Sequence, residues 1–395
     1  MAYTYLLAVL VALTSCAEKA PVEPPLPAGH LRPGSYSFGH LRIWPTVDTS
    51  DALNAEAIAC LRRFCQFKLD TSRANDFWLI TDLERFGGIH GELFAAEFDS
   101  VGEPRYPPTL LAINSTGNPD ERLLTVRWAE EDGAGIAKRV RYVFDFLAKR
   151  TGDGVRLSFP LDHLTRDWER IGMRPITFIV SPGRTFSMEQ ARQQVKDVER
   201  LALLFDIPAF PITYYSCMDP TELFRIRGYQ HHPLMHVFPT GGRAEGKDIV
   251  FSGNNKEIYT HEVVHLFTGM KFHGRPWVLD EGLATFLAGS SEKPYSWHRA
   301  NLKVYLASGA MPDMEKVLTS YEPTYINEHT NLAYAIGGAL CERILRTQGK
   351  EGLFAVLASG EEHVFTALAG MGITRENLRQ ELMKELELEP YALNW

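Results

Sequence analysis

The sequence predicts an α+β protein built from two units, and three observations support this. Its 395 residues, 45% of them hydrophobic, are enough for about two domains with sizeable cores. Residues 33–165 combine one amphipathic helix with segments in which apolar and polar residues alternate, as in an α+β module. Residues 170–395 begin with short buried strands and end in a helical part over 300–395.

The N-terminus predicts export and a lipid anchor. The apolar run over 5–13 is shorter than the roughly 20 residues of a membrane-spanning helix, so residues 1–15 are predicted to be a signal peptide. The letters LTSC, ending at Cys16, resemble the lipobox of bacterial lipoproteins, which implies cleavage before Cys16 and acylation of its thiol. The Pro-rich stretch 16–32 would then tether the protein to the bacterial cell envelope, on the outer membrane or a periplasmic face. An ordinary secretory peptide with an incidental cysteine is the alternative.

The first unit, residues 33–165, is predicted to be an accessory domain. It opens with a helix over 52–69, and the later segment LLTVRWAEED alternates as a half-buried strand does. A helix followed by antiparallel strands loosely resembles the cone-shaped NTF2-like domains. Cys60 and Cys65 point in different directions on the predicted helix, so we expect the cysteines after Cys16 to be free and buried.

The second unit, residues 170–395, starts with a strand in PITFIVSPG. Ser187 and Gln190 form a capping box at the start of the next helix. Two further strands follow, AFPITYYSCMD and the segment 248–252. The last of these lies just before the most informative helix of the chain, and we expect it to be an edge strand that pairs with an extended peptide.

That helix carries the motif H-E-x-x-H. His261 and His265 are four residues apart, so both imidazoles can face one metal ion from the same side of a helix. Glu262 lies about 100° round the helix, where it can hold a water molecule without being a ligand.

The helix is predicted to cover residues 257–269. Asn254 and Asn255 offer an N-cap, and Gly269 is a C-terminal stop signal.

A third ligand is expected from the helix predicted over 277–288, which starts after Pro276. A catalytic zinc ion needs three protein ligands and one open position. The sequence DEGLA on this helix offers Glu281, fifteen residues after His265. Its neighbour Asp280 is the alternative ligand, because adjacent residues on a helix cannot both face the ion.

The two helices together resemble the gluzincin metallopeptidases, in the branch of peptidase MA-like proteins. The second active-site helix of that family carries Asn/Asp-Glu-Gly-x-Ala, matched here by DEGLA. The resemblance implies that one Zn²⁺ is bound by His261, His265 and Glu281, and that Glu262 is the general base. It also implies a zincin fold with a small mixed sheet, in which Gly282 lets the two helices pack closely.

Gluzincins often place a tyrosine or histidine near the reaction oxyanion, beyond the third ligand. Tyr334 in NLAYAIGGAL is the candidate, with Tyr321 and Tyr325 as rivals and a packed core tyrosine as the alternative.

A second histidine group, His231, His232 and His236, could be mistaken for another metal site. Pro233 argues against a helix there, so we expect loop or strand histidines near the active-site cleft instead of ligands.

The sequence therefore predicts a zinc-dependent peptidase, anchored at the cell envelope, that hydrolyses peptide or protein substrates. The net charge of −8 indicates that nucleic acid is not a partner. One alternative is a catalytically weak zincin-fold protein that acts as a binding or scaffolding module. Another is a zinc amidase that acts on a non-protein substrate.

Overall fold

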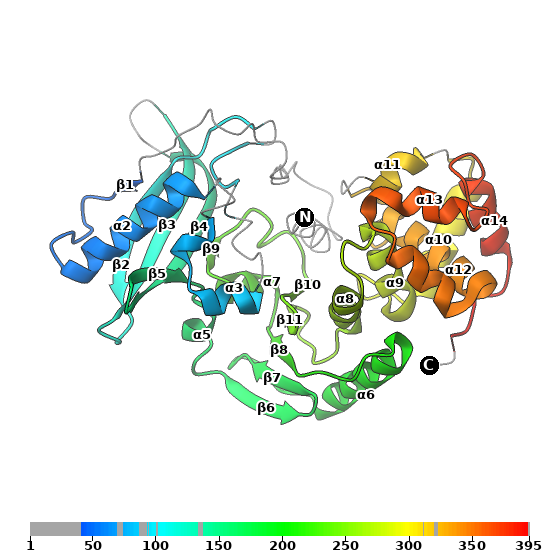
Figure 1. Ribbon diagram of the computed structural model, residues 1–395, viewed down its shortest axis with the longest axis horizontal. Helices are drawn as coiled ribbons and strands as arrows, with labels where there is room; N and C mark the ends of the chain where they lie inside the picture. The colour runs from blue at the N-terminus through cyan, green and yellow to red at the C-terminus, as the bar shows by residue number, and fades with distance from the viewer. Residues whose placement is uncertain are drawn as a thin grey trace.

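A computed structural model describes residues 41–68, 74–86, 93, 95–99, 102–132, 137–310, 312–319 and 323–393. The predicted signal peptide, Cys16, the tether and Tyr321 lie outside the described residues. The protein is a mixed α+β structure with two sheets and several helices, as predicted. Figure 1 shows the first sheet at one end, the second in the middle and a group of helices at the other end.

The first sheet has six strands and lies in the N-terminal part. Five of them follow the chain in spatial order: β1 (Arg42–Ile43), β2 (Pro108–Ser115), β3 (Glu121–Glu131), β4 (Ala137–Thr151) and β5 (Gly154–Ser158). All these neighbours are antiparallel except β1 and β2. The long strand β4 also pairs with β9 (Tyr229–His231), which comes from far along the chain.

Helix α2 (Ala52–Phe67) packs against this sheet and ends two residues earlier than predicted. The side chain of Asp51 accepts a hydrogen bond from the N–H of Asn54 and caps the helix. Phe64 is fully buried beside Trp78 and Phe146. The shorter helices η2 (Ala74–Phe77), α3 (Ile80–Phe86) and α5 (Leu161–Leu164) complete this part. The four cysteines expected to be free and buried are so: Cys60, Cys65, Cys217 and Cys341.

The second sheet has five strands. In spatial order they are β10 (Gly242–Glu245), β11 (Ile249–Ser252), β8 (Ile212–Ser216), β7 (Ile176–Val180) and β6 (Glu169–Met173). The three central strands run parallel, and β10 and β6 are antiparallel to their neighbours. Helix α6 (Met188–Phe205) connects β7 to β8, and α7 (Pro220–Ile226) precedes β9.

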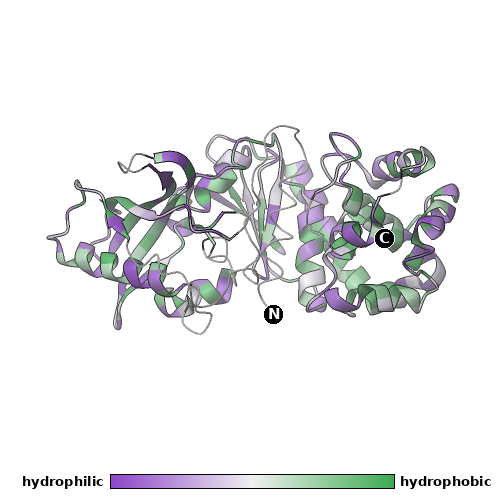
Figure 2. Cartoon of the chain, turned by 90° about the horizontal axis from the view of Figure 1, so that it is seen from above, coloured by the Kyte–Doolittle hydropathy of each residue, from purple (hydrophilic) through white to green (hydrophobic). Residues whose placement is uncertain are grey.

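Both faces of the second sheet are buried, because its strands alternate between two cores. Tyr214 and Val250 belong to the core shared with α6 and the C-terminal helices. Tyr215 and Phe251 belong to the core of the first sheet. Figure 2 shows apolar residues along the strands at one end and among the helices at the other. Residues on both sides of the predicted division between residues 165 and 170 contribute to the core of the first sheet. The division itself stays a prediction.

The C-terminal part is helical. Its helices are α8 (Thr260–Lys271), α9 (Trp277–Ala288), α10 (Tyr295–Ala307), α11 (Met314–Thr319), α12 (Leu332–Leu357), η3 (Glu361–His363), α13 (Val364–Ala369) and α14 (Leu378–Glu387). No helix within the described ranges has the length and apolar character required to cross a membrane.

Helices α9 and α12 cross in backbone contact at two glycines. A Cβ atom on Gly282 would lie 2.2 Å from the carbonyl carbon of Gly337, and one on Gly337 would lie 2.1 Å from the carbonyl oxygen of Val278. Only glycine permits this approach, so Gly282 lets the helix that carries Glu281 pack against α12. The prediction that Gly282 packs this helix against the motif helix α8 is wrong, because its open side faces Gly337.

We expect Gly337→Ala to lower the free energy of unfolding by about 2 kcal/mol or more, although alanine favours helices, because the helices must separate. Chemical denaturation checks this, with Gly172→Ala as the control, since nothing lies within 4 Å of a Cβ there. Equal effects of the two substitutions would contradict the contact.

Candidate metal centre

The motif helix α8 begins at Thr260, three residues later than predicted, and side chains of α6 hold its start. Gln190 Oε1 accepts from the N–H of Glu257 at 3.0 Å, and Gln194 Oε1 accepts from the N–H of Tyr259 at 2.6 Å. Asp197 accepts a hydrogen bond from the Thr260 hydroxyl at 2.7 Å. These acceptors satisfy donors at the start of the helix, which no local side chain caps.

The predicted caps of this helix are therefore wrong. Asn254 instead accepts a hydrogen bond from the N–H of Gly241, and Asn255 has a positive φ of 54° in a turn. Gly269 lies inside the helix, which continues to Lys271.

A buried ion pair fixes the chain just before α8. Glu257 is fully buried and pairs with Arg184. Its other oxygen accepts from the N–H of Ser187 at 3.0 Å, and Ser216 donates to the carboxylate at 3.0 Å. A buried carboxylate with this many partners is stable where it is, so it sets the position from which α8 starts. This role of Glu257 was not predicted from the sequence.

Helix α9 covers residues 277–288, the predicted range, and a distant side chain caps it. The carboxylate of Glu361 in η3 accepts a hydrogen bond from the N–H of Trp277 at 2.7 Å. Burial raises the pKa of Glu361 to about 7 and the charge of Asp280 adds to this, although the bond from Trp277 opposes it.

Because the carboxyl of Glu361 has a raised pKa, we expect its contribution to the free energy of unfolding to depend on pH. Between its ordinary value of 4.5 and about 7, Glu361 keeps its proton in the folded chain and loses it in the unfolded chain. The contribution of Glu361 to stability is therefore greatest below pH 4.5 and is lost as pH rises through 7. Relative to wild type, Glu361→Gln should be more stable at pH 8 than at pH 5 by on the order of 2 kcal/mol. Denaturant unfolding of the metal-free chains checks this, and an equal difference at both pH values would contradict it.

The fold brings His261, His265 and Glu281 together. One potential ligand atom from each lies within 4.8 Å of the others. Glu281 Oε2 is 3.2 Å from His261 Nε2 and 3.5 Å from His265 Nε2. His261 and Glu281 are buried, and His265 is nearly so. These three side chains could hold one metal ion, and they are the three predicted ligands.

The Nδ1 atoms of the two histidines contact other groups on the side of each ring away from Glu281. His261 Nδ1 lies 2.8 Å from the carbonyl oxygen of Gly289, which can only accept, so Nδ1 carries the proton. His265 Nδ1 lies 3.0 Å from Asp280 Oδ2. Both Nε2 atoms are thereby aimed at Glu281, the arrangement seen around metal-binding histidines.

Asp280 lies on the opposite side of His265 from Glu281, so the geometry makes Glu281 the ligand candidate. Arg275 lies 2.7 Å from Asp280, and Thr268 donates to it at 2.5 Å. Burial opposes ionisation, but Arg275 and His265 hold the pKa of Asp280 well below its usual range. Asp280 is thus an ionised residue that orients His265.

Charge and unpaired atoms also fit a cation at this point. Against the effect of burial, His265 and His261 lower the pKa of Glu281 to about 2, so it is ionised. Burial alone would lower the pKa of His265, but Asp280 and Glu281 raise it well above its usual range. Three buried polar atoms make no hydrogen bond to the described residues: His265 Nε2, Glu262 Oε1 and the Tyr334 hydroxyl. Buried polar atoms normally have partners, so an ion and a water molecule would complete this cluster.

Glu262 is buried next to the cluster and close to strand β10. Burial raises the pKa of Glu262, while the imidazoles of His265 and His261 lower it. The backbone of Ala244 in β10 lies close to this carboxylate and also lowers its pKa. An acid with a raised pKa beside a metal site is well placed to exchange protons.

The predicted edge strand is wrong. Residues 249–252 form β11, which lies between β8 and β10 and has no free edge. In the part of the chain that the structure describes, β10 has one edge without a partner strand. Strand β6 is the other edge of this sheet, and β10 is the edge strand that lies next to Glu262.

Tyr334 lies beside the cluster, next to His261. Its ring stacks near that of His261, with centroids 6.2 Å apart, and the side chain is buried. Burial and the charge of Glu281 raise the pKa of its phenol well above the usual value, so it stays protonated. Tyr325 lies near enough to influence the same phenol.

A cavity of about 480 Å³ adjoins the cluster on the side of His261. Tyr259 and Gly289 line it, and Lys256 and Glu292 pair at 2.5 Å among its exposed lining residues. A small part of a ligand could occupy this cavity beside His261.

The second histidine group does not join the cluster. His231 is in β9, in the first sheet. His232 is buried against Phe224, with ring centroids 4.5 Å apart, and its Nδ1 accepts from the N–H of Leu234. His236 Nδ1 lies 3.2 Å from the Thr221 hydroxyl. As predicted, these are strand and loop residues, and the metal-binding group found among the described residues contains none of them.

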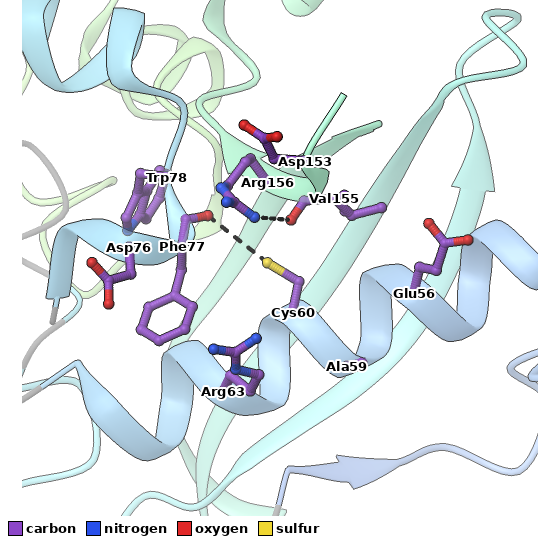
Figure 3. A pocket seen from close by; sticks show the side chains of 11 residues that line it. Glu56, Ala59, Cys60, Arg63, Asp76, Phe77, Trp78, Asp153, Val155 and Arg156 are labelled. Atoms are coloured by element: carbon purple, nitrogen blue, oxygen red, sulfur yellow. Dashed lines mark hydrogen bonds between the residues drawn. The ribbon is translucent and has the colours of Figure 1, made fainter. Parts of the chain in front are cut away.

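A larger cavity, of about 700 Å³, lies in the first unit, and none of the predicted site residues that the structure describes lines it. Figure 3 shows it between α2, η2 and the turn before β5, with Arg63 and Arg156 on either side of Cys60. Burial raises the pKa of the Cys60 thiol to about 11, so this thiol is not a reactive nucleophile at neutral pH.

No protein-family model matches this chain, and no curated protein matches it significantly.

Proposed function

We propose that the protein is a zinc-dependent peptidase of the gluzincin type, held at the bacterial cell envelope. The observation that carries the proposal is the convergence of His261, His265 and Glu281 at one buried point, with Glu262 and Tyr334 buried close by. Two nitrogen ligands and one carboxylate are a donor set that zinc uses in catalytic sites. The second sheet with α8 and α9 would then be the zincin domain, and the first sheet an NTF2-like accessory domain.

The three ligands would hold the ion through the two Nε2 atoms and the Glu281 carboxylate. A bound zinc ion would supply Lewis acidity and lower the pKa of a coordinated water molecule toward about 7. Glu262, whose Oε1 has no hydrogen-bond partner among the described residues, would lie beside that water molecule.

The residues of the chain have separate tasks in amide hydrolysis. Glu262 would accept a proton from the attacking water and deliver it to the leaving amine. The protonated Tyr334 phenol would donate a hydrogen bond to the developing oxyanion. Strand β10 would bind the extended substrate through main-chain hydrogen bonds and hold the scissile carbonyl next to Glu262.

The envelope location rests on the proposed acylation of Cys16. Incorporation of a labelled fatty acid in the wild-type chain but not in Cys16→Ala would support it, and equal labelling of both would contradict it.

Chelation tests the peptidase proposal. We expect the chain from residue 30 onward to cleave a peptide library, to stop after metal removal, and to recover with one equivalent of zinc. Unchanged cleavage after metal removal would contradict the metal mechanism. Zinc binding without cleavage, together with capture of a protein or cell-wall fragment, would favour a binding module. Cleavage confined to non-peptide amides would favour an amidase.

A further inference from the structure

The turn between α9 and α10 orients the imidazole of His261, the candidate ligand, through a hydrogen bond to its Nδ1 atom. The Gly289 carbonyl in this turn accepts the hydrogen bond from His261 Nδ1 at 2.8 Å. Gly289 has a φ of 77°, and a Cβ atom there would lie 2.1 Å from the carbonyl oxygen of Lys293. The carbonyl can therefore take this direction only because residue 289 is glycine.

The rest of this turn is tight. Ser290 and Lys293 exchange two backbone hydrogen bonds, at 3.0 and 2.8 Å. Ser291 and Glu292 between them both have positive φ, 47° and 61°, a conformation that side chains other than glycine disfavour. A turn of this kind keeps its shape best when neighbouring elements hold it.

His298 on α10 holds the turn from the inside. It is 1% exposed, and its Nε2 lies 2.9 Å from the carbonyl oxygen of Ser290. Because that oxygen can only accept, Nε2 carries the proton and donates. Nδ1 then accepts from the Thr330 hydroxyl at 3.1 Å. Burial lowers the pKa of His298, although its backbone bonds oppose this, so the ring stays neutral in this arrangement.

The same histidine connects the turn to the helix of Tyr334. Thr330 is fully buried and comes directly before Asn331, the N-cap of α12. His298 thus links three elements: α10 itself, the turn that directs His261, and the start of the helix that carries Tyr334.

We infer that His298 is a positioning residue for the metal centre, because it fixes the turn whose Gly289 carbonyl orients His261. The inference rests on the proposed function and adds to it a residue that touches neither metal nor substrate. A neutral imidazole is suited to this place, because it donates on one side and accepts on the other without adding charge beside the cation.

The test is the zinc affinity of the full chain, measured by competition with a chromophoric chelator. His298→Leu should bind zinc about tenfold more weakly, by analogy with other residues that orient metal ligands. His298→Gln keeps a donor for Ser290 and should recover part of the affinity. Thr330→Val removes one hydroxyl and should lie between wild type and His298→Leu.

His232→Leu is the matched control, because His232 is also a buried histidine but packs in the first sheet. It should lower thermal stability and leave the zinc affinity of the folded chain unchanged. Cobalt in place of zinc supplies a second readout, since its visible spectrum should change in His298→Leu and not in His232→Leu.

The outcomes separate the inference from the proposed function. No zinc binding by the wild-type chain would overturn both. Normal zinc binding by wild type, with equal affinity in the His298 and Thr330 variants, would overturn the inference alone. If His298→Leu does not fold, His298→Gln and Thr330→Val decide: weaker binding supports the inference, and wild-type binding overturns it.

Discussion

Glu262→Gln is expected to lower peptide hydrolysis by about 10³-fold or more while zinc stays bound. The amide has nearly the shape of the carboxylate but cannot accept a proton, so the water that attacks the substrate would not be deprotonated. The zinc content should not fall, since Glu262 is not among the three residues that converge as ligands. Cleavage rates on a peptide library and elemental analysis of the same samples check both statements.

Glu387→Gln is the control for this comparison. Glu387 lies on α14, is 62% exposed and pairs with Lys303, so its loss should change activity little. Cleavage by Glu262→Gln at the rate of this control would show that the glutamate of the motif is not the base.

Glu281→Ala is expected to bind zinc more than about 100-fold more weakly, and Asp280→Asn only about 10- to 100-fold more weakly. The first change removes a ligand. The second leaves the ligands in place and weakens only the orientation of His265, which Asp280 contacts at 3.0 Å.

Chelator competition measures both affinities, and unfolding curves of the metal-free variants show whether each chain is folded. The reverse order, with Asp280→Asn the more severe, would make Asp280 the ligand and would contradict the geometry described above.

Much of the candidate site could be predicted because its signals are local. Helix α9 has its predicted bounds, and Pro276 marks its start in the sequence. His261 and His265 come together because they are four residues apart on one helix. Glu281 reaches them from the next helix, as the spacing indicates.

The errors and omissions have a common physical cause, which is that distant parts of the chain complete the site. The start of α8 is held by Gln190 and Gln194 of α6, and for this reason the predicted local caps, Asn254 and Asn255, are wrong. The order of strands in a sheet is not encoded in any one strand, and for this reason β11 was mistaken for the edge.

The supporting residues carried no motif at all. Glu361 caps α9 from 84 residues away, and His298 acts through the backbone of a turn. A weak signal existed for the turn, because glycine at position 289 directly after an apolar helix indicates a backbone that other residues cannot adopt.

The most direct test of the central claim is a crystal structure of the zinc-loaded chain, with the ion located by its anomalous scattering. We expect one zinc ion about 2 Å from His261 Nε2, His265 Nε2 and a carboxylate oxygen of Glu281, with Glu262 facing the open position. An ion bound by Asp280 in place of Glu281, or a well-ordered site that takes up no zinc, would contradict it.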